Sequence, residues 1–320
     1  MQQQGILNRR YLRVKVFQAL YAYQSSNKDM IVGEKNMLKS INDIQDLYLY
    51  MLLLITDMGE MARRQIELNS QKRLPTEDDL NPNTKFVDNK VLSIIDNNVQ
   101  IQKLLETKKI SWAIESDNVK KLWRQIRDSE LYIEYMNNPS RSFQEDKQFI
   151  ISIFKAFIAE YEILHDFLED RSIYWYDDLS LVCINIVKFI NTLKDDDNPD
   201  SSILPTLFKD KEDDIQFIKE LYKKTISFDP ELGSLIDNNT SNWELERIAK
   251  LDVLLMKMAL CEVLYFRNIP VKVSLNEYIE LAKSYSTPNS GNFINGVLDK
   301  LVAQLKNDNK IAKTGRGLIN

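Results

Sequence analysis

The chain contains little glycine and little proline, with eight of each among 320 residues. Both residue types concentrate in tight turns, and β-sandwiches and barrels need such turns between many short strands. Their scarcity therefore disfavours a many-stranded fold. Hydrophobic residues make up 44% of the chain and charged residues 28%, which predicts a packed core beneath a solvated surface.

Histidine and cysteine are scarcer still. His165 stands alone, and the two cysteines, Cys183 and Cys261, lie far apart within apolar helical patterns. A single histidine without a nearby cysteine cannot supply the usual ligand count of a zinc site, and no positioned nucleophile accompanies it. We therefore expect a structural or surface role for His165. The cysteines are typical of buried thiols in a reducing compartment, which predicts a cytoplasmic protein.

Motifs that carry catalysis are also missing. The sequence contains no P-loop, no GxGxxG and no GxSxG. The acidic runs Asp195–Asp197 and Glu212–Asp214 could attract a divalent ion, but calcium loops need alternating ligands and a glycine. A solvated loop or helix start is the simpler interpretation. The sequence thus predicts no enzyme, no cofactor and no metal site.

Long apolar runs are absent as well. The most apolar segment, Leu47 to Ile55, contains two tyrosines and is too short to span a bilayer. The N-terminus has arginines without a following small-residue cleavage site, so we expect no signal peptide and no membrane partner.

Helical periodicity dominates what remains. Apolar residues at helical spacing predict helices over about 8–24, 40–70, 88–108, 116–136, 142–170 and 178–195, with a loop at 74–84. Asn8 is a plausible N-cap of the first helix. An acidic, turn-rich stretch at 194–199 marks a candidate domain boundary.

The C-terminal part is the most regular. Capping-box spacing at Ser241–Glu244 and at Ser274–Glu277 predicts one helix to about Arg267 and another through about Tyr285. A last helix follows the turn at 287–290, and the polar residues 307–320 are predicted to form a flexible tail.

The chain also repeats itself at an offset of 68 residues. Gln148-Phe149-Ile150 recurs as Gln216-Phe217-Ile218, and Trp175 recurs as Trp243. Amphipathic helices alone account for part of this agreement, but two tryptophans in register favour a degenerate duplication.

Positive charge gathers at the two ends of the chain. Residues 1–28 contain five basic and no acidic residues, and with residues 244–320 the ends carry about +8 of a formal total of −5. Arg9, Arg10 and Arg13 fall at i, i+1 and i+4, on the first turns of one helix. Cations there oppose the helix dipole. From the residues alone, a solubilising terminus and a phosphate-binding site remain equally good interpretations.

The turn Asn289-Ser290-Gly291-Asn292-Phe293 is a second candidate. Backbone N–H groups at a helix start suit an anion, and Phe293 could stack on an unpaired base. Phe293 also fits the apolar stripe of the last helix, so core packing explains it equally well.

Longer strings indicate a family. Asn276-Glu277-Tyr278-Ile279-Glu280-Leu281-Ala282-Lys283, then Phe293-Ile294-Asn295-Gly296-Val297-Leu298-Asp299-Lys300, together with Ile269–Val273, resemble the signature of the bacterial transcription antitermination factor NusB family. Arg9-Arg10, Arg13 and Gln18–Tyr21 resemble its arginine-rich N-terminal helix. The resemblance covers about 6–28 and 213–305.

That resemblance implies an all-α fold of two small helical subdomains with a large helical insertion. The predicted organisation is a NusB-like RNA-binding core formed by 1–29 and 206–306, and a helical insertion at 30–205 that is a candidate degenerate duplication. The implied partners are single-stranded, boxA-like RNA of ribosomal RNA leader transcripts, ribosomal protein S10/NusE and the transcription elongation complex. The implied RNA-binding residues are Arg9, Arg10, Arg13, Lys15, Asn289, Ser290, Asn292 and Phe293.

Partner contact is implied around Tyr21 and Asp252. Asp252 also attracts attention by itself, because it interrupts the apolar run Leu251 to Leu255 and a buried, unpaired carboxylate would be costly. We therefore expect Asp252 to have a partner.

Two departures and two alternatives accompany this hypothesis. The family's turn usually carries an acid where Asn289 stands, and often a basic residue or histidine where Gly291-Asn292 stands. A helical protein-interaction scaffold that works through its acidic insertion is one alternative. The other is an accessory domain of the kind fused to ribosomal RNA cytosine methyltransferases, although the glycine-rich cofactor segment is absent.

Overall fold

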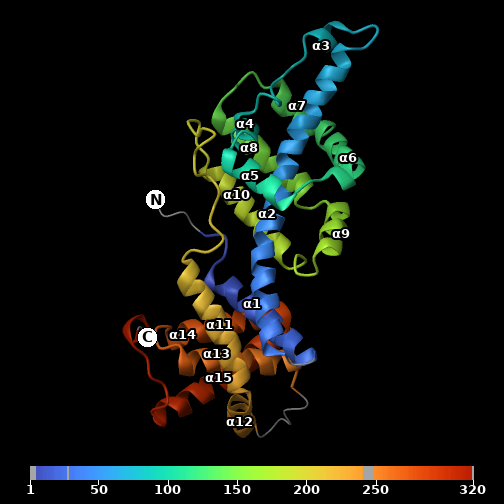
Figure 1. Ribbon diagram of the computed structural model, residues 1–320. Helices are drawn as coiled ribbons and strands as arrows, with labels where there is room; N and C mark the ends of the chain where they lie inside the picture. Colours follow the sequence, from blue (N-terminus) through green and yellow to red (C-terminus); the bar gives the residue numbers. More distant parts are fainter. Residues whose placement is uncertain (1–4, 27–28, 241–247, 319–320) are drawn as a thin grey trace. The chain divides into compact units, whose positions relative to one another are not determined.

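The computed structural model describes residues 5–26, 29–240 and 248–318, and all regular elements in these ranges are helical (Figure 1). The predicted all-α fold class is confirmed. Asn8 caps the first helix as expected, since its side-chain oxygen accepts a hydrogen bond from the N–H of Tyr11 at 3.0 Å.

The first ten α-helices are α1 (Arg9–Ser25), α2 (Met30–Ser70), α3 (Glu77–Leu80), α4 (Lys90–Asp96), α5 (Val99–Lys108), α6 (Ser116–Arg127), α7 (Glu130–Asn137), α8 (Phe143–Ile153), α9 (Glu162–Arg171) and α10 (Asp178–Thr192). A π-helical turn, Phe154–Ile158, continues α8. The later ones are α11 (Lys211–Ser227), α12 (Asp229–Asn239), α13 (Lys250–Tyr265), α14 (Val271–Tyr285) and α15 (Ser290–Asn307), and short 3-10 turns lie at Ala113–Glu115 and Gly315–Leu318.

These helices form two compact units. The middle unit comprises Met1–Ile6 and Asn42–Leu207, and the terminal unit comprises Leu7–Ile41 and Phe208–Asn320. Helix α2 belongs to both, because its turns up to Ile41 pack in the terminal unit and the remainder packs in the middle unit. The insertion at 30–205 stays a prediction.

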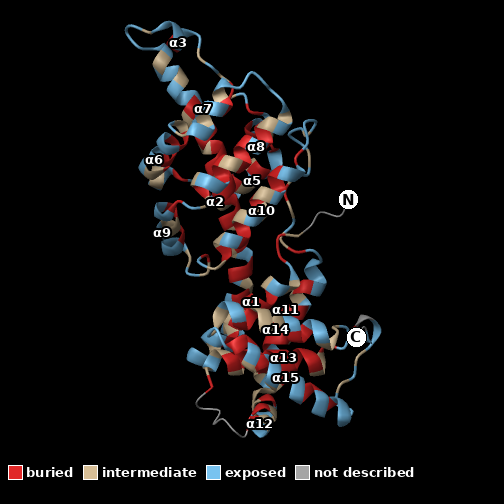
Figure 2. Cartoon of the chain, turned by 180° about the vertical axis from the view of Figure 1, so that it is seen from behind, coloured by how far each residue is buried: buried red, intermediate tan, exposed pale blue. Residues whose placement is uncertain are grey.

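Helix α13 is the core of the terminal unit. Helices α1, α11, α12, α14 and α15 all pack against it. Its central residues are at most 1% exposed, namely Leu254, Leu255, Met256, Met258, Ala259, Leu260, Cys261 and Val263. A helix that is apolar on every side belongs at the centre of a bundle. Figure 2 shows buried residues along α13. Each large aliphatic side chain buried there contributes roughly 1.5–3 kcal/mol.

In the middle unit the core helix is α2. The run Leu47 to Ile55, too short for a membrane span, is almost wholly buried and forms the centre of this unit. Tyr50 in this run packs edge-on against Trp112 and Trp175, with ring centroids 5.3 and 5.8 Å apart. None of the helices that the structure describes is long and apolar enough to cross a membrane.

The predicted duplication matches the order of helices. Helices α8, α9 and α10 begin at Phe143, Glu162 and Asp178. Helices α11, α12 and α13 begin 68, 67 and 72 residues later, at Lys211, Asp229 and Lys250. Helix α4 packs on α8 as α1 packs on α11. Trp243 lies outside the described residues. The duplication remains a prediction.

Several local expectations need correction. The predicted helices at 88–108, 116–136 and 142–170 each consist of two α-helices, namely α4 and α5, α6 and α7, and α8 and α9. The predicted capping box at Ser274–Glu277 is wrong, because α14 already begins at Val271 after the extended Pro270. The predicted loop at 74–84 contains the short α3, closed by a capping box between Thr76 and Asp79. Helix α2 begins at Met30, ten residues before the apolar stripe that predicted it. The Ser241–Glu244 box lies outside the described residues.

The C-terminal segment, predicted to be a tail, contacts the end of α13 over its described part. The ammonium of Lys313 donates to the carbonyl of Phe266 at 2.9 Å and faces that of Glu262 at 3.4 Å. The Thr314 N–H donates to the carbonyl of Arg267 at 2.9 Å. A cation at the C-terminus of a helix satisfies otherwise unpaired carbonyls and complements the dipole.

Gly33 should be irreplaceable although it lies inside a helix. A β-carbon at this position would stand 2.0 Å from the hydroxyl oxygen of Tyr222 and 3.1 Å from its ring carbon Cζ. Tyr222 is fully buried, so it cannot yield. Gly33→Ala would ordinarily stabilise a helix by up to about 1 kcal/mol, but here we expect a loss of about 1–3 kcal/mol from overpacking.

Tyr222→Phe provides the matched test, because it removes the clashing oxygen, which has no hydrogen-bond partner among the described residues. Chemical unfolding of both single variants and the double variant should show that Tyr222→Phe recovers part of the loss. If the changes in unfolding free energy of the two single variants simply add in the double variant, the expected clash between the new β-carbon and the Tyr222 hydroxyl is contradicted.

A second prediction concerns Asp57 on α2. Burial, together with the smaller effects of the charges on Asp96 and Glu60, raises the pKa of its carboxyl to about 6. The pKa of Asp57 is higher in the folded state than in the unfolded state. Below about pH 4 the carboxyl is protonated in both states and does not affect stability, whereas above about pH 6 it is ionised in both states and destabilises the fold. Asp57→Asn should therefore raise the free energy of unfolding by up to about 3 kcal/mol at pH 8 and leave it unchanged at pH 3.5. Denaturant unfolding at both pH values checks this; an equal gain at both would refute it.

Candidate functional site

Helix α1 carries the three arginines at its start, and the terminal unit surrounds them with acids. Arg9 pairs with Asp213 and with Asp214, the latter at 2.9 Å from its Nε. Arg10 binds Glu277 with two hydrogen bonds of 2.9 and 3.0 Å. The arginines thus lie together, as the helical spacing predicts, but each is engaged by a carboxylate.

Arg13 is the innermost of the three. Its Nε and Nη2 donate to the two carboxylate oxygens of Glu262 at 2.8 and 2.7 Å, and the residues are 2% and 0% exposed. Ser274 and Tyr278 donate to the same carboxylate at 2.7 and 3.1 Å. Burial by itself lowers the pKa of Arg13, but the charge and hydrogen bonds of Glu262 outweigh it and raise that pKa above its ordinary value.

Arg9 and Arg10 lie nearer the surface. The Arg9 guanidinium carbon lies 4.3 Å from the ring centroid of Phe217, a cation–π contact that fixes its plane. Arg10 is the more accessible, with half of its side chain exposed, and the hydrogen bonds that it donates to Glu277 raise its pKa. These two arginines can therefore reach an external anion, whereas Arg13 cannot.

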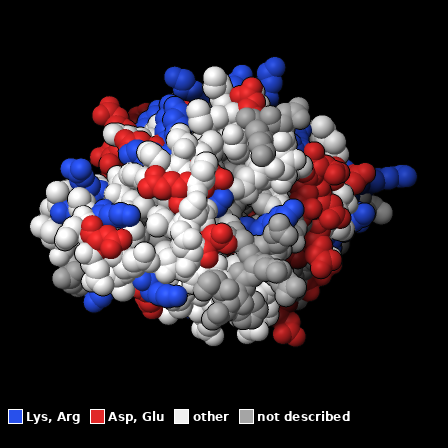
Figure 3. All heavy atoms as spheres, turned by 90° about the horizontal axis from the view of Figure 1, so that it is seen from below, with Lys and Arg blue, Asp and Glu red and all other residues white. Residues whose placement is uncertain are grey.

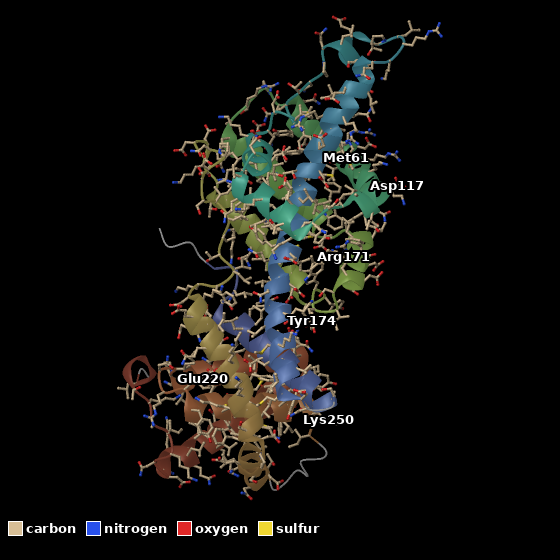
Figure 4. All side chains as sticks on the ribbon, viewed as in Figure 1. Met61, Asp117, Arg171, Tyr174, Glu220 and Lys250 are labelled. Carbon is tan, nitrogen blue, oxygen red and sulfur yellow. The ribbon has the colours of Figure 1, made fainter. Side chains whose placement is uncertain are left out.

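The arginines line a hollow of about 810 Å³ on the terminal unit. Its other walls are the face of α11 that carries Phe217 and Glu220, the loop from Phe266 to Pro270, and Glu277 of α14. Glu220 is labelled on α11 in Figure 4. Three arginines face three acids in this lining, since Asp213 completes the acidic set. The hollow is thus electrically balanced.

Lys15 does not belong to this surface. Its side chain is 1% exposed, because α1 packs against both α11 and α13 and is buried over residues 12–17. The predicted contact of Lys15 with RNA would require α1 to leave the bundle.

The second candidate, the turn at Asn289–Phe293, is built around Asp252. Ser286 and Ser290 donate to the two oxygens of Asp252 at 2.5 and 2.8 Å. Ser290 is buried, and Asp252 is 5% exposed. Asp252 has the partners that its place in an apolar run predicted, but they lie within the chain. Ser290 therefore holds the turn and is not presented to a ligand.

Asn289, Asn292 and Phe293 remain accessible at this turn. Both asparagines are exposed and Phe293 is half-buried. Asn289 stands at the N-cap position of α15 without capping it through its side chain. Lys283 places a cation beside this turn, although the sequence motif does not indicate it. Its Cγ lies 3.2 Å from the position that a β-carbon of Gly291 would occupy. Its ammonium pairs with Glu280 at 2.7 Å.

The arginines and the turn at 289–293 lie toward opposite ends of the contact between α1 and α14. Arg10 contacts Glu277 near the start of α14, and the ring of Phe17 lies 5.5 Å from that of Tyr285 at the last residue of α14. Eight helical residues separate Glu277 from Tyr285, about 12 Å along the axis. Tyr21, one turn after Phe17, is 47% exposed.

Sequence reasoning missed the acids that surround the arginines. Glu262 interrupts the apolar stretch of α13 just as Asp252 does, so the argument that found Asp252 could have found it. Asp213 and Glu277 gave no such signal, because both belong to ordinary helix-start patterns. In Figure 3 basic and acidic side chains are mixed over part of the face shown, and acidic side chains gather along its right side.

The other candidates of the sequence analysis have local roles. Nε2 of His165 lies 3.0 Å from the carbonyl of Ala159 in the same segment. Asp195 pairs with Lys90, and no cluster in the described ranges could hold a metal ion. Both cysteines are free thiols, and burial raises the pKa of each to about 12.

Glu262→Gln should be one of the most damaging conservative changes in this unit. It leaves the Arg13 guanidinium buried beside a neutral amide, for which we expect a loss of about 3–5 kcal/mol in the free energy of unfolding. Arg10→Gln is the matched control, because it breaks a similar two-bond contact at the surface and should cost less than about 1 kcal/mol. Urea unfolding of both variants measures these losses of unfolding free energy. Similar losses would show that burial does not distinguish the Arg13–Glu262 pair from the Arg10–Glu277 pair.

The comparisons with known proteins cover part of the chain. The NusB family model matches residues 187–303, from within α10 into α15. Transcription antitermination protein NusB of Salinibacter ruber is 45% identical over 103 residues, which are 32% of this chain and 64% of that protein. Its namesake in Finegoldia magna is 42% identical over 94 residues, 29% of this chain and 69% of that protein.

A third protein of the same name, from Chloroherpeton thalassium, is 40% identical over 104 residues, or 32% of this chain and 49% of its own length. The chain therefore spans about half to two thirds of the curated relatives that it matches. No solved structure matches it. The matched segment contains α11 to α14, which supply Asp213, Glu262, Glu277 and the walls of the hollow. By this similarity the chain belongs to the NusB family.

Proposed function

We propose that this chain acts in transcription antitermination by binding single-stranded, boxA-like RNA of ribosomal RNA leader transcripts together with ribosomal protein NusE. In this role it is an adaptor of the cytoplasmic transcription elongation complex and performs no catalysis. The curated relatives bear the name of antitermination proteins, which supports the general role. The RNA and the ribosomal partner follow from the resemblance of the two motifs.

The observation that carries the proposal is the pair Arg9 and Arg10 at an accessible hollow. Guanidinium groups match phosphate oxygens with paired hydrogen bonds, and both side chains are partly exposed at this hollow. Phe217 behind Arg9 and Glu277 beside Arg10 keep the two groups in place. Because a phosphate contact carries no sequence information, these residues would supply affinity and register.

Arg13 has a positioning role in this proposal. Its guanidinium is occupied by Glu262 and enclosed, so it fixes α1 against α13 and α14 and thereby fixes Arg9 and Arg10. Lys15 is likewise structural.

The turn at the start of α15 would read the bases. Asn289 and Asn292 offer exposed amides that can both donate and accept, and the half-exposed Phe293 offers a ring for stacking. Ser290 and Asp252 hold the turn in shape from behind. Lys283 would provide the cation that is missing at Gly291-Asn292, in place of the family's usual residue.

We assign the protein partner to the surface around Tyr21. Tyr21 is an exposed aromatic residue on α1, beyond the arginines and on the same helix. Asp252 would support this contact indirectly, because its carboxylate is already bound by two serines. The middle unit would then be an addition to the family core that extends the adaptor.

The double variant Arg9→Ala/Arg10→Ala tests the RNA site. We expect at least a tenfold loss of affinity for a boxA-like single-stranded RNA, measured by fluorescence anisotropy over a range of salt concentrations. The slope of the logarithm of affinity against that of salt should become shallower by about 1.4, since each phosphate contact on a single strand contributes about 0.7.

Lys300→Ala/Lys306→Ala is the matched control. It removes the same charge from two exposed lysines in the last turns of α15, away from the hollow and from the turn. Its slope and affinity should stay near those of the unmodified chain. Equal losses in both variants would reduce the effect to net charge, and no loss in either would rule out the arginine site.

A further inference from the structure

The acids around the arginines differ sharply in burial. The Asp214 side chain is 7% exposed and also accepts a hydrogen bond from the N–H of Asp210 at 3.2 Å. Glu277 is 19% exposed and contacts both Arg10 and, at 3.8 Å, Arg13. The Asp213 side chain is 63% exposed, and its carboxylate meets the Arg9 guanidinium from the solvent side. Arg9 therefore has one inner carboxylate and one outer carboxylate.

The outer carboxylate is weakly held. Asp213 stands in the first turn of α11, where its backbone N–H donates to the capping side chain of Asp210 at 3.1 Å. Its own carboxylate projects from this turn to Arg9 and is well hydrated, and exposed ion pairs of this kind contribute little to stability. Rotation of the Asp213 side chain would open the outer edge of Arg9 and leave its contacts with Asp214 and Phe217 intact.

We propose that Asp213 is an internal competitor of the RNA phosphate, which occupies Arg9 in the free protein and is displaced when RNA binds. This inference rests on the proposed function and specifies what limits the affinity of the site. A phosphodiester presents oxygens with the same geometry toward a guanidinium as a carboxylate does. With Asp213 in place the hollow has no net charge, and an approaching phosphate meets a carboxylate where it should meet Arg9.

A competing role for Asp213 also accounts for the run of acids in the first turn of α11, which the arginines alone do not explain. The first turn of α11 carries Glu212, Asp213 and Asp214 in succession, and the helix N-terminus favours such acids. Asp214 is needed to hold Arg9, and Glu212 does not line the hollow, whereas Asp213 does. A carboxylate at this point limits binding of isolated phosphates and favours a strand that makes several contacts at once.

The test uses Asp213→Asn in the full chain, with Glu212→Gln as control. Both changes remove one negative charge from the same helical turn, so their effects on net charge and on the helix dipole are matched. Binding of the boxA-like single-stranded RNA is measured over a range of salt concentrations. Asp213→Asn should bind about 3–10-fold more tightly at low salt, with a slope steeper by up to about 0.7. Glu212→Gln should change neither quantity appreciably.

A cycle with Arg9→Ala shows whether the effect passes through Arg9. If Asp213 competes for that guanidinium, Asp213→Asn has no benefit in the Arg9→Ala background. A persisting benefit, or an equal benefit from Glu212→Gln, would mean general repulsion and would overturn the proposal. Weaker binding by Asp213→Asn would also overturn it, because Asp213 would then position Arg9 for RNA.

These outcomes separate the inference from the function on which it rests. If the unmodified chain and Asp213→Asn both fail to bind the RNA, the proposed function fails and this inference fails with it. If the unmodified chain binds through Arg9 and Arg10 but does not respond to Asp213→Asn, only the inference fails. Asp213→Ser is a second variant, which keeps a polar group in the first turn of the helix. Thermal unfolding of each variant checks that it is folded.

Discussion

The carboxylate of Glu262 is the interaction on which the terminal unit depends. It accepts hydrogen bonds from Arg13 on α1 and from Ser274 and Tyr278 on α14, while Glu262 itself lies on the central helix α13. Bringing this pair out of water is expensive, and only full satisfaction of the carboxylate offsets the cost. An apolar contact would tolerate sliding or rotation of α1, but this set of directed bonds does not. The orientation of α1, and hence of Arg9 and Arg10, follows from it.

Charge in this protein has to be counted where the side chains meet. Along the sequence the N-terminal arginines form a basic segment in an acidic chain. In the fold, α11 and α14 bring Asp213, Asp214 and Glu277 against them, from more than 200 residues away. The local charge is therefore close to balanced. This makes exchange of ion pairs, and not simple attraction, the central question for the site.

The fold was largely predictable because helices and their apolar faces are local properties. The all-α class and the cap at Asn8 follow from spacing and capping residues, whereas the breaks between α4 and α5, α6 and α7, and α8 and α9 were not predicted. The errors arose where tertiary contacts override a local pattern. Ser274 and Glu277 have the spacing of a capping box, yet the helix starts earlier and both side chains bind elsewhere, to Glu262 and Arg10. Similarly, α2 extends beyond its predicted start, with Gly33 fitting closely against Tyr222.

The sequence by itself determined the helices, the family resemblance and the residue types available at both halves of the candidate site. It also indicated that Asp252 needs a partner, because a lone charge in an apolar run is costly wherever it lies. Only the tertiary structure decided which of the predicted residues face solvent. Arg9, Arg10 and Arg13 are equivalent as a motif, but burial and ion pairing make Arg13 a support and leave Arg9 and Arg10 accessible. The physical reason is that a side chain's charge is set locally, whereas its exposure and counter-ions are set by helices distant in sequence.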